Sequence, residues 1–293
     1  MNNEEQKSRL KSARTFLFVP GDQPDRIKKA LAAHADAVII DLEDAVRQES
    51  KGAARQSLAS LIETKRDASA PLILIRTNEA SSPEFIEDIK AALDLNVDAI
   101  MLPKFVPGES AVAAEKVISQ QETLAGAQNQ LLIIGLVETT AGVLNLLNSS
   151  LIPERVQRLA FGAADLHADL GISYSSSNPN SDLAMAAIVL ASASAKLGAP
   201  IDSPHFAIAD ETGLRERSTF AHHMGFGAKL CIHPNQLATV SEVFTLSEKE
   251  RDWALAVHER WNKRDESSGA LLVDGALVDE AMVKRAKQIL GLL

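Results

Sequence analysis

Short apolar runs alternate with longer amphipathic stretches along most of the chain. The apolar runs lack the alternation of polar and apolar positions that marks a half-exposed strand, so we interpret them as parallel strands covered on both faces. Eight such runs occur: TFLFVPG (15–21), AVIIDLED (37–44), LILIRTN (72–78), AIMLPK (99–104), LLIIGLVET (131–139), RLAFGAAD (158–165), PIDSPH (200–205) and AKLCIHP (228–234).

Each apolar run is followed by a stretch with helical periodicity, and the strict alternation of eight strands and eight helices within residues 14–246 predicts an α/β fold, a (β/α)8 TIM barrel, as the catalytic domain. No GxGxxG motif follows any of these runs, which weakens the alternative of an open dinucleotide-binding sheet.

Outside the barrel we expect a flexible N-terminus over residues 1–13. Residues 247–293 are predicted to form a small C-terminal lid of two helices and a hairpin around Asp274–Gly275.

The composition of the chain indicates which classes of binding partner and which cellular compartment to expect. The chain of 293 residues has a formal net charge of -9 and no long basic run, which argues against nucleic acid as the main partner. A single cysteine, Cys231, excludes an intramolecular disulfide and favours a reducing compartment. The first residues show no signal-peptide core, and no apolar run approaches the roughly 18 residues of a membrane span. We therefore expect a cytoplasmic protein with no membrane partner.

Charged side chains gather at the carboxyl ends of the predicted strands, where barrel enzymes place their active sites. These strand-end residues are Asp41, Glu43 and Asp44, followed by Arg76, Lys104, Glu138 and Asp165. Glu138 and Asp165 form the pair most like a metal site. Carboxylates without a Cys cluster or His-x-His spacing suit Mg2+ or Mn2+ rather than zinc. The alternative is a buried carboxylate that pairs with Arg76 or Lys104.

The strand-end residues lie in motifs that together resemble the citrate lyase beta-subunit-like family of the HpcH/HpaI aldolase superfamily, close to malyl-CoA and citramalyl-CoA lyases. The motifs cover nearly the whole chain: RTFLFVPGDQPDRIKKA, DLEDAV with KGAAR behind it, IRTN, MLPK, VETTAGVLN, FGAADLHADLG, GFGAKLCIHPNQ and DGALVDEAMVKRA. The resemblance implies a (β/α)8 barrel, commonly a homotrimer or hexamer. Members use Mg2+ to make or break a carbon–carbon bond between an acyl-CoA enolate and a 2-oxo acid.

The same resemblance implies roles for individual residues. Glu138 and Asp165 resemble the metal ligands, and Glu138 is also expected to contact the substrate. Arg76 resembles the residue that binds the carboxylate of the oxo acid and the developing oxyanion. Glu43 and Asp44 resemble carboxylates that hold water on the metal and orient Arg76 or its neighbours.

Two further groups of residues extend the expected site. Asp279, in the predicted lid, resembles an acid/base that reaches into the site of a neighbouring subunit. A basic groove for CoA would be formed by Arg14, Arg26, Lys28 and Lys104.

We therefore predict a Mg2+-dependent carbon–carbon lyase that cleaves or forms a 3-hydroxyacyl-CoA, such as citryl-, malyl- or citramalyl-CoA, with an acyl-CoA thioester and a 2-oxo acid as its small-molecule partners.

Two other functions stay open at this point. Residues 184–187 read AMAA where relatives often carry two arginines, which puts CoA binding in doubt. A class II-type aldolase that acts on free 2-oxo acids without CoA would fit that loss. The third possibility is a non-autonomous binding subunit of a multi-protein lyase complex that works beside an acyl carrier protein. An acid/base at Asp279 favours a self-sufficient enzyme over this subunit.

Overall fold

The structure is a computed structural model of the chain and describes residues 3–61, 69–148, 151–173, 178–264 and 269–292. The chain divides into two compact units, Met1–Phe244 and Thr245–Leu293. We call these the barrel unit and the C-terminal unit and describe each by itself.

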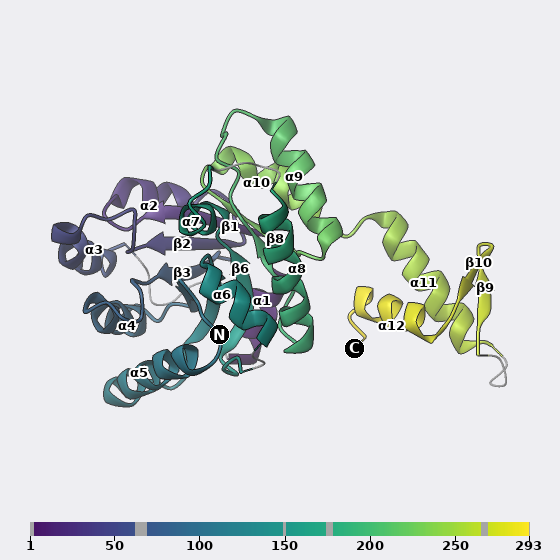
Figure 1. Cartoon of the computed structure of the whole chain (residues 1–293), viewed down its shortest axis with the longest axis horizontal. Helices are drawn as coiled ribbons and strands as arrows, with labels where there is room; N and C mark the ends of the chain where they lie inside the picture. The colour runs from purple at the N-terminus through teal and green to yellow at the C-terminus, as the bar shows by residue number, and fades with distance from the viewer. Residues whose placement is uncertain (1–2, 62–68, 149–150, 174–177, 265–268, 293) are drawn as a thin grey trace. The chain divides into compact units, whose positions relative to one another are not determined.

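The barrel unit is a closed barrel of eight parallel strands that follow one another in chain order (Figure 1). Strand β1 pairs with β2 on one side and with β8 on the other, which closes the barrel. The predicted (β/α)8 TIM barrel is therefore confirmed. The strands are β1 (Thr15–Pro20), β2 (Ala37–Asp41), β3 (Leu72–Arg76), β4 (Ala99–Leu102), β5 (Leu132–Val137), β6 (Val156–Phe161), β7 (Ile201–Asp202) and β8 (Ala228–Cys231).

Helices surround the barrel and cover the outer face of its strands (Figure 1). They are α2 (Pro24–Leu31), α3 (Lys51–Leu58), α4 (Glu84–Asp94), α5 (Glu109–Ala125), α6 (Thr140–Asn148), α8 (Pro179–Ser194), α9 (Glu211–Met224) and α10 (Leu237–Phe244). A short helix, α7 (Ala163–Asp169), follows β6 directly, and 3-10 turns occur at η1 (Gln48–Ser50) and η2 (Pro234–Gln236). Among the described helices, none is both long enough and apolar enough to cross a membrane.

Alternate residues of each strand face the inside of the barrel, because successive side chains of a strand point to opposite faces. Ala37 and Ile39 of β2 belong to the apolar cluster inside the barrel. Val38 and Ile40 belong to the larger cluster between the strands and the helices. This alternation continues into the polar residues at the carboxyl ends of the strands and decides which of them point into the barrel mouth.

Residues 3–13 pack against the barrel, although the sequence predicts a flexible segment over residues 1–13. Helix α1 (Asn3–Ser12) places Leu10 in the interior cluster, where this side chain is fully buried. The buried guanidinium of Arg158 donates hydrogen bonds to the carbonyl oxygens of Leu10 (3.2 Å) and Ala13 (2.6 Å). The expectation of flexibility was wrong because these tertiary contacts, which no local pattern reveals, offset the entropy cost of ordering a polar segment.

The C-terminal unit contains α11 (Glu248–Asn262), the antiparallel pair β9 (Leu271–Val273) and β10 (Ala276–Val278), and α12 (Glu280–Ile289). The turn between the strands has positive φ at Asp274 (51°) and Gly275 (83°), the backbone that a tight hairpin needs. The unit has a small core of its own: Ala254, Val257, Val273, Val278, Val283 and Ala286.

Candidate active site

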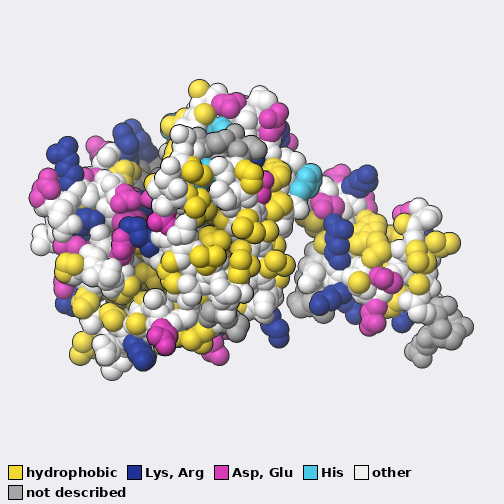
Figure 2. Space-filling view, in the orientation of Figure 1, with side chains coloured by type: hydrophobic (Ala, Val, Ile, Leu, Met, Phe, Trp, Pro, Cys, Tyr) yellow, Lys and Arg dark blue, Asp and Glu magenta, His cyan; other side chains and the backbone are white. Residues whose placement is uncertain are grey.

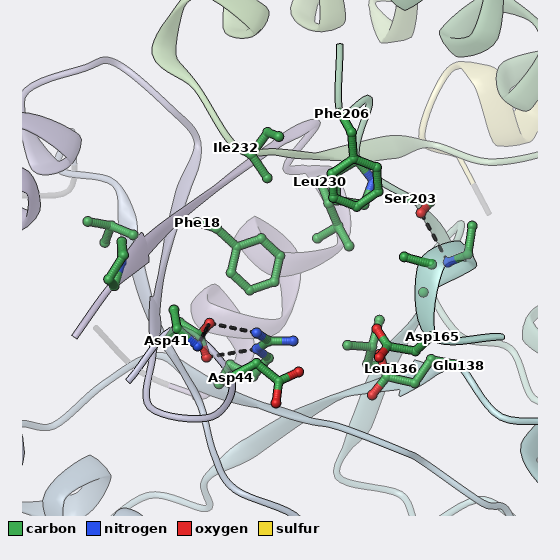
Figure 3. A pocket seen from close by; sticks show the side chains of 18 of the residues that line it. Phe18, Asp41, Asp44, Leu136, Glu138, Asp165, Ser203, Phe206, Leu230 and Ile232 are labelled. Carbon is green, nitrogen blue, oxygen red and sulfur yellow. Dashed lines mark hydrogen bonds and ion pairs between the residues drawn. The ribbon is translucent and has the colours of Figure 1, made fainter. Parts of the chain in front are cut away.

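Three inward-facing positions at the carboxyl ends of the strands carry charged side chains. Asp41 continues the inward register of β2, Arg76 that of β3 and Glu138 that of β5, because each lies two residues beyond an interior apolar residue. Together with Asp44 and Asp165, they line one cavity of about 410 Å³ (Figure 3). The structure thus brings together residues from four separate βα segments at the mouth of the barrel.

Arg76 is held by two carboxylates and one aromatic ring. Its Nε and Nη2 atoms donate hydrogen bonds to Asp41 Oδ1 (2.8 Å) and Oδ2 (2.6 Å), and Nη1 lies 3.1 Å from Glu43 Oε2. Its guanidinium carbon lies 5.1 Å from the centroid of the Phe18 ring. Burial acts to lower the pKa of Arg76, but hydrogen bonding to Asp41 and the charges of Asp41 and Glu43 outweigh it and raise that pKa. Arg76 is therefore a permanently charged fork fixed in orientation.

The sequence analysis placed Asp41 at the barrel mouth but gave it no role, and the structure makes it the main partner of Arg76. Its two oxygens also accept the backbone N–H groups of Glu43 (2.9 Å) and Ala45 (3.3 Å), which folds the loop after β2 back over the strand end. The signal was present in the sequence, because Asp41 has the inward register of Ile39. The sequence analysis assigned roles to Glu43 and Asp44 and none to Asp41, although the inward-facing position of Asp41 follows from that of Ile39.

A buried lysine, also missed from the sequence, braces the same loop. Lys51 is 6% exposed and donates hydrogen bonds to the carbonyl oxygens of Leu42 and Glu43, both at 2.9 Å, and to Asn78 Oδ1. This ammonium group lies at the start of α3, in the KGAAR motif, and connects the loop after β2 with the loop after β3. It therefore positions Glu43 without lining the cavity itself.

Glu43 is buried between two cations and has no aligned hydrogen bond to either oxygen within the described residues. Its Oε2 atom forms the ion pair with Arg76, and Oε1 lies 3.7 Å from Lys104 Nζ. Burial raises the pKa of Glu43 to about 7, while the positive charge of Arg76 acts in the opposite direction. Asp44, by contrast, is exposed and lines the cavity.

Lys104 holds Glu138 through its backbone rather than through its ammonium group. Its φ of 47° directs the backbone N–H toward Glu138 Oε1, at 2.9 Å. The ammonium group pairs with Glu79 and lies 3.7 Å from Glu43. Lys104 is not among the residues that line the cavity, so its predicted direct contact with substrate has no support in the geometry.

Glu138 and Asp165 lie side by side at the cavity, across from Asp41 and Asp44 (Figure 3). Glu138 is 2% exposed, and Gly162 makes room for it: a Cβ atom at Gly162 would lie 2.6 Å from Glu138 Oε2. Burial raises the pKa of Glu138 to about 8, and the negative charges of Asp165 and Glu43 add to that shift. A carboxylate in this setting is stabilised by a nearby cation.

These two carboxylates fit a magnesium ion better than a metal that needs a full protein cage. Among the described residues, no three His, Cys, Asp or Glu side chains converge on one point. Mg2+ is commonly bound by one or two carboxylates, and water and substrate oxygens complete its shell. Glu138 has one oxygen engaged by the Lys104 N–H group, and its other oxygen lies against Gly162 beside Asp165. The donor set is therefore compatible with Mg2+ held by Glu138 and Asp165.

The other wall of the cavity is apolar. Phe18 and Leu230 continue the interior cluster toward the mouth, and Phe206, on the loop after β7, is 47% exposed at the rim. Figure 3 shows these side chains on the side opposite the carboxylates. The cavity thus has a charged half for oxygen atoms and an apolar half for carbon.

The predicted basic groove is only partly present at the cavity. Arg14 precedes β1 and therefore lies at the amino end of the barrel, roughly 20 Å along a six-residue strand from the mouth. Its backbone N–H donates to Asp36 Oδ2 (2.9 Å). Strand direction separates Arg14 from the cavity of its own barrel, so this position gives no support to its predicted role in binding substrate. Of the cations expected to bind CoA, Arg26 on α2 lines the cavity and is exposed.

Asp279 lies in the C-terminal unit, at the N-cap of α12. Its Oδ1 atom accepts the backbone N–H of Met282 at 3.1 Å, and the residue is exposed. The carboxylate is therefore accessible to a partner or substrate. Asp279 lies outside the barrel unit, so the geometry of the cavity does not test its role, and its assignment as acid/base stays a prediction.

Comparison with known proteins places the chain in a family. The HpcH/HpaI aldolase/citrate lyase family model matches residues 14–234. The citrate lyase subunit beta of Leuconostoc mesenteroides subsp. cremoris is 30% identical over 297 residues, which cover 100% of this chain and 95% of that protein. An L-malyl-CoA/beta-methylmalyl-CoA lyase of Cereibacter sphaeroides is 29% identical, with 94% and 93% covered.

A solved structure agrees over both units. The crystal structure of CitE from Mycobacterium tuberculosis in complex with magnesium, acetoacetate and coenzyme A has a TM-score of 0.75 and 28% identity. The similarity covers 96% of this chain and 98% of that chain. Sequence and fold thus agree over nearly the full length, and the chain belongs to the HpcH/HpaI aldolase/citrate lyase family.

Proposed function

We propose that the protein is a Mg2+-dependent carbon–carbon lyase that cleaves or forms a 3-hydroxyacyl-CoA thioester, with an acyl-CoA and a 2-oxo acid as the other reactants. One observation carries the proposal: the fixed guanidinium of Arg76 and the Glu138–Asp165 pair line the same cavity. A 2-oxo acid has a carboxylate and a carbonyl on adjacent carbons. It can bind a cationic fork and a metal ion at once.

Arg76 supplies the charge-assisted hydrogen bonds of the site. Because Asp41 and Glu43 hold the guanidinium on two sides, little reorganisation is needed when negative charge develops on the oxo-acid oxygens. Mg2+, when bound at Glu138 and Asp165, would polarise the oxygen that becomes the carbonyl of the oxo acid. Mn2+ offers the same oxygen chemistry and is a possible substitute.

A proton must also be delivered to the thioester α-carbon. In the cleavage direction the hydroxyl group gives its proton to a carboxylate base at the cavity, the carbon–carbon bond breaks, and its electron pair forms the thioester enolate. An acid then protonates the α-carbon and releases the acyl-CoA. We assign this proton to Asp279, whose carboxylate is exposed at the start of α12.

This role for Asp279 includes a proposal about assembly. We propose that the protein forms a homotrimer or a hexamer in which Asp279 of one copy acts in the cavity of a neighbouring copy. The test mixes two inactive variants, Glu138→Gln and Asp279→Asn, after subunits have been dissociated and reassembled. Mixed assemblies then contain some sites with both wild-type residues, and activity returns in part. If the mixture stays inactive although subunit exchange is verified by mass, Asp279 does not act between copies.

The charges of the cavity favour a 2-oxo acid with one carboxylate, such as glyoxylate or pyruvate. Among the described residues, its lining includes two cations, Arg26 and Arg76, and four carboxylates: Asp41, Asp44, Glu138 and Asp165. Arg76 already pairs with Asp41. A second substrate carboxylate, as in oxaloacetate, would face four carboxylates and would have to compete with the CoA phosphates for Arg26. The apolar wall instead suits a hydrogen or methyl substituent.

Arg26 favours a CoA thioester over a free acid as substrate. It is exposed at the edge of the cavity, on a helix that also carries Lys28 and Lys29 in its last turn. These cations offer an electrostatic site for phosphate groups outside the reaction cavity. The alternative, an aldolase of free 2-oxo acids, would bind no such phosphate groups and would not need these cations. The single cysteine, Cys231, is buried and free, in keeping with a proposed cytoplasmic setting.

The deciding experiment offers the purified full-length protein malyl-, citramalyl- and citryl-CoA in the presence of Mg2+. Release of a 2-oxo acid, abolished by EDTA and restored by Mg2+, is the expected result. Release of free CoA without any 2-oxo acid would instead identify thioester hydrolysis. If none of the three thioesters reacts while a free 2-oxo acid undergoes aldol chemistry, the proposed CoA dependence is wrong.

A further inference from the structure

Helix α7, which carries Asp165, is too short to hold this side chain in place by itself. It spans seven residues, Ala163–Asp169, and helices shorter than about 12–15 residues are marginal without tertiary contacts. Its N-cap residue, Gly162, has no side chain that could accept the first backbone N–H groups of the helix. The orientation of Asp165 therefore depends on contacts from other elements.

The first of these contacts comes from Ser203, which supplies the cap that Gly162 lacks. Ser203 Oγ accepts the backbone N–H of Ala163 at 3.1 Å, from a position 40 residues further along the chain (Figure 3). Ser203 is 6% exposed and lies two residues beyond Ile201, an interior residue of β7, so it faces the barrel mouth. Side chains that accept the first N–H groups fix where a helix begins. Ser203 thus sets the start of α7, two residues before Asp165.

The end of β7 is itself held by a buried ion pair. This strand has only two residues, and β6 pairs with it at a single position, Ala160 with Ile201. Asp202 points to the face opposite to Ile201 and Ser203, where it pairs with Lys229 of β8. Asp202 and Lys229 are both buried, and separating them would leave a buried charge without its partner. The pair therefore fixes the strand end from which Ser203 reaches α7.

Two further contacts hold the middle and the end of α7. His167 Nε2 and Ser181 Oγ of α8 lie 2.6 Å apart and share a hydrogen bond. Both residues are buried, so water does not compete for this bond. At the end of the helix, Asp169 Oδ2 accepts the backbone N–H (2.7 Å) and the hydroxyl (2.6 Å) of Thr140, which lies two residues after Glu138. The helix is thus anchored at its start, middle and end.

The groups that anchor α7 from other elements are neutral hydroxyl and backbone groups. The helices that supply two of them carry little charge: α6 has no charged residue, and α8 has one, Asp182. Figure 2 shows hydrophobic side chains gathered over α6 and α8. A neutral anchor fixes α7 without supplying a counter-charge, so the negative charge of Asp165 is left for a cation from solution.

We propose that Ser203 and Ser181 are positioning residues, which fix α7 so that Asp165 meets a cation beside Glu138. Neither hydroxyl group needs to touch the metal. The inference rests on the proposed Mg2+ site and deepens it. Metal–ligand distances tolerate only about 0.2 Å, so a loosened α7 would lose coordination although Asp165 itself is unchanged. Partners that orient a metal ligand commonly change metal affinity by about 10–100-fold.

The test is calorimetric titration of the full-length protein with Mg2+ alone. Ser203→Ala and Ser181→Ala should each weaken Mg2+ binding by about tenfold, and the two changes together by about 100-fold. Ser203→Thr keeps the hydroxyl oxygen and should keep the wild-type affinity. The matched control is Ser218→Ala on α9, a fully buried serine whose Oγ donates to the carbonyl oxygen of Leu214 at 2.6 Å. It loses a buried hydrogen bond of the same kind and should leave Mg2+ binding unchanged.

Glu138→Gln, titrated in parallel, separates this inference from the proposed metal site. If Glu138→Gln weakens Mg2+ binding while both alanine variants bind as tightly as the wild type, the site stands and the positioning role is wrong. Equal losses in Ser203→Thr and Ser203→Ala would also exclude the role of the hydroxyl group. If Glu138→Gln binds Mg2+ like the wild type, the site and this inference fail together. Amide hydrogen exchange, measured without metal, should rise in α7 for both alanine variants and stay unchanged there for Ser218→Ala.

Discussion

Replacing Gly162 by alanine tests whether Glu138 binds the metal, without removing a ligand. Gly162 has φ of -108° and ψ of 83°, outside the left-handed region, so alanine meets no positive-φ strain. The difficulty is steric. The added Cβ would lie 2.5 Å from Glu138 Cβ and 2.6 Å from Oε2, where apolar atoms prefer separations of about 3.5–4.0 Å. Glu138 would have to move by about 1 Å.

Two magnitudes follow from this displacement. Overpacking a close contact costs about 1–3 kcal/mol of folding free energy. Metal–ligand distances tolerate about 0.2 Å, so a shift of about 1 Å removes Glu138 from effective coordination. Disturbing the support of a metal ligand commonly weakens metal affinity by about 10–100-fold. At a Mg2+ concentration of 100 times the wild-type Kd, Mg2+ should stabilise the wild type by about 2.7 kcal/mol. A variant whose site is 100-fold weaker should gain only about 0.4 kcal/mol.

The assay is urea unfolding with and without Mg2+, combined with calorimetric titration of Mg2+. Gly52→Ala is the matched control, because the new Cβ would meet nothing within 4 Å. Gly52 lies in α3, so alanine there should raise stability by about 0.5–1 kcal/mol and leave Mg2+ binding unchanged. If Gly162→Ala binds Mg2+ with wild-type affinity, Glu138 is not a ligand, whatever the variant does to stability.

Three further predictions concern the charged fork, the substrate and the buried thiol. Arg76→Lys should lower kcat by on the order of 10²–10³, because the planar fork held by Asp41 is lost; near-normal turnover would exclude the role proposed for Arg76. In calorimetric titrations with Mg2+, glyoxylate or pyruvate should bind at least about tenfold more tightly than oxaloacetate, from the cost of placing a second carboxylate among the four carboxylates of the cavity; the reverse order would refute the charge argument. Burial raises the pKa of Cys231 to about 12, so a thiol reagent at pH 8 should react only as fast as the protein unfolds. Because this thiol has its ordinary pKa near 9 when unfolded, stability should fall as pH rises from about 9 toward 12, and a flat unfolding free energy over that range would contradict the shift.

The sequence alone determined the barrel and the end of it that carries the site. Apolar runs without alternation specify strands buried on both faces, and eight of them separated by helices leave few other folds. Because every strand of a parallel barrel points the same way, residues after a strand must lie at one end and residues before it at the other. That rule placed Glu138 and Asp165 correctly at the mouth. Applied to Arg14, which precedes the first strand, the same rule predicts a position at the amino end, away from the cavity of its own barrel.

Only the tertiary structure decided which charges pair. Asp41 and Arg76 are 35 residues apart, and their bidentate contact depends on the register between β2 and β3, which no local pattern contains. Lys104 has a positive φ, and its backbone N–H, rather than its ammonium group, contacts Glu138 at the site. Helix α1 is held by Arg158, which lies 148 residues beyond Leu10 in the sequence. Periodicity is a local property of the chain and can be read from it, whereas pairing and burial of charges depend on segments that meet only after the barrel has closed.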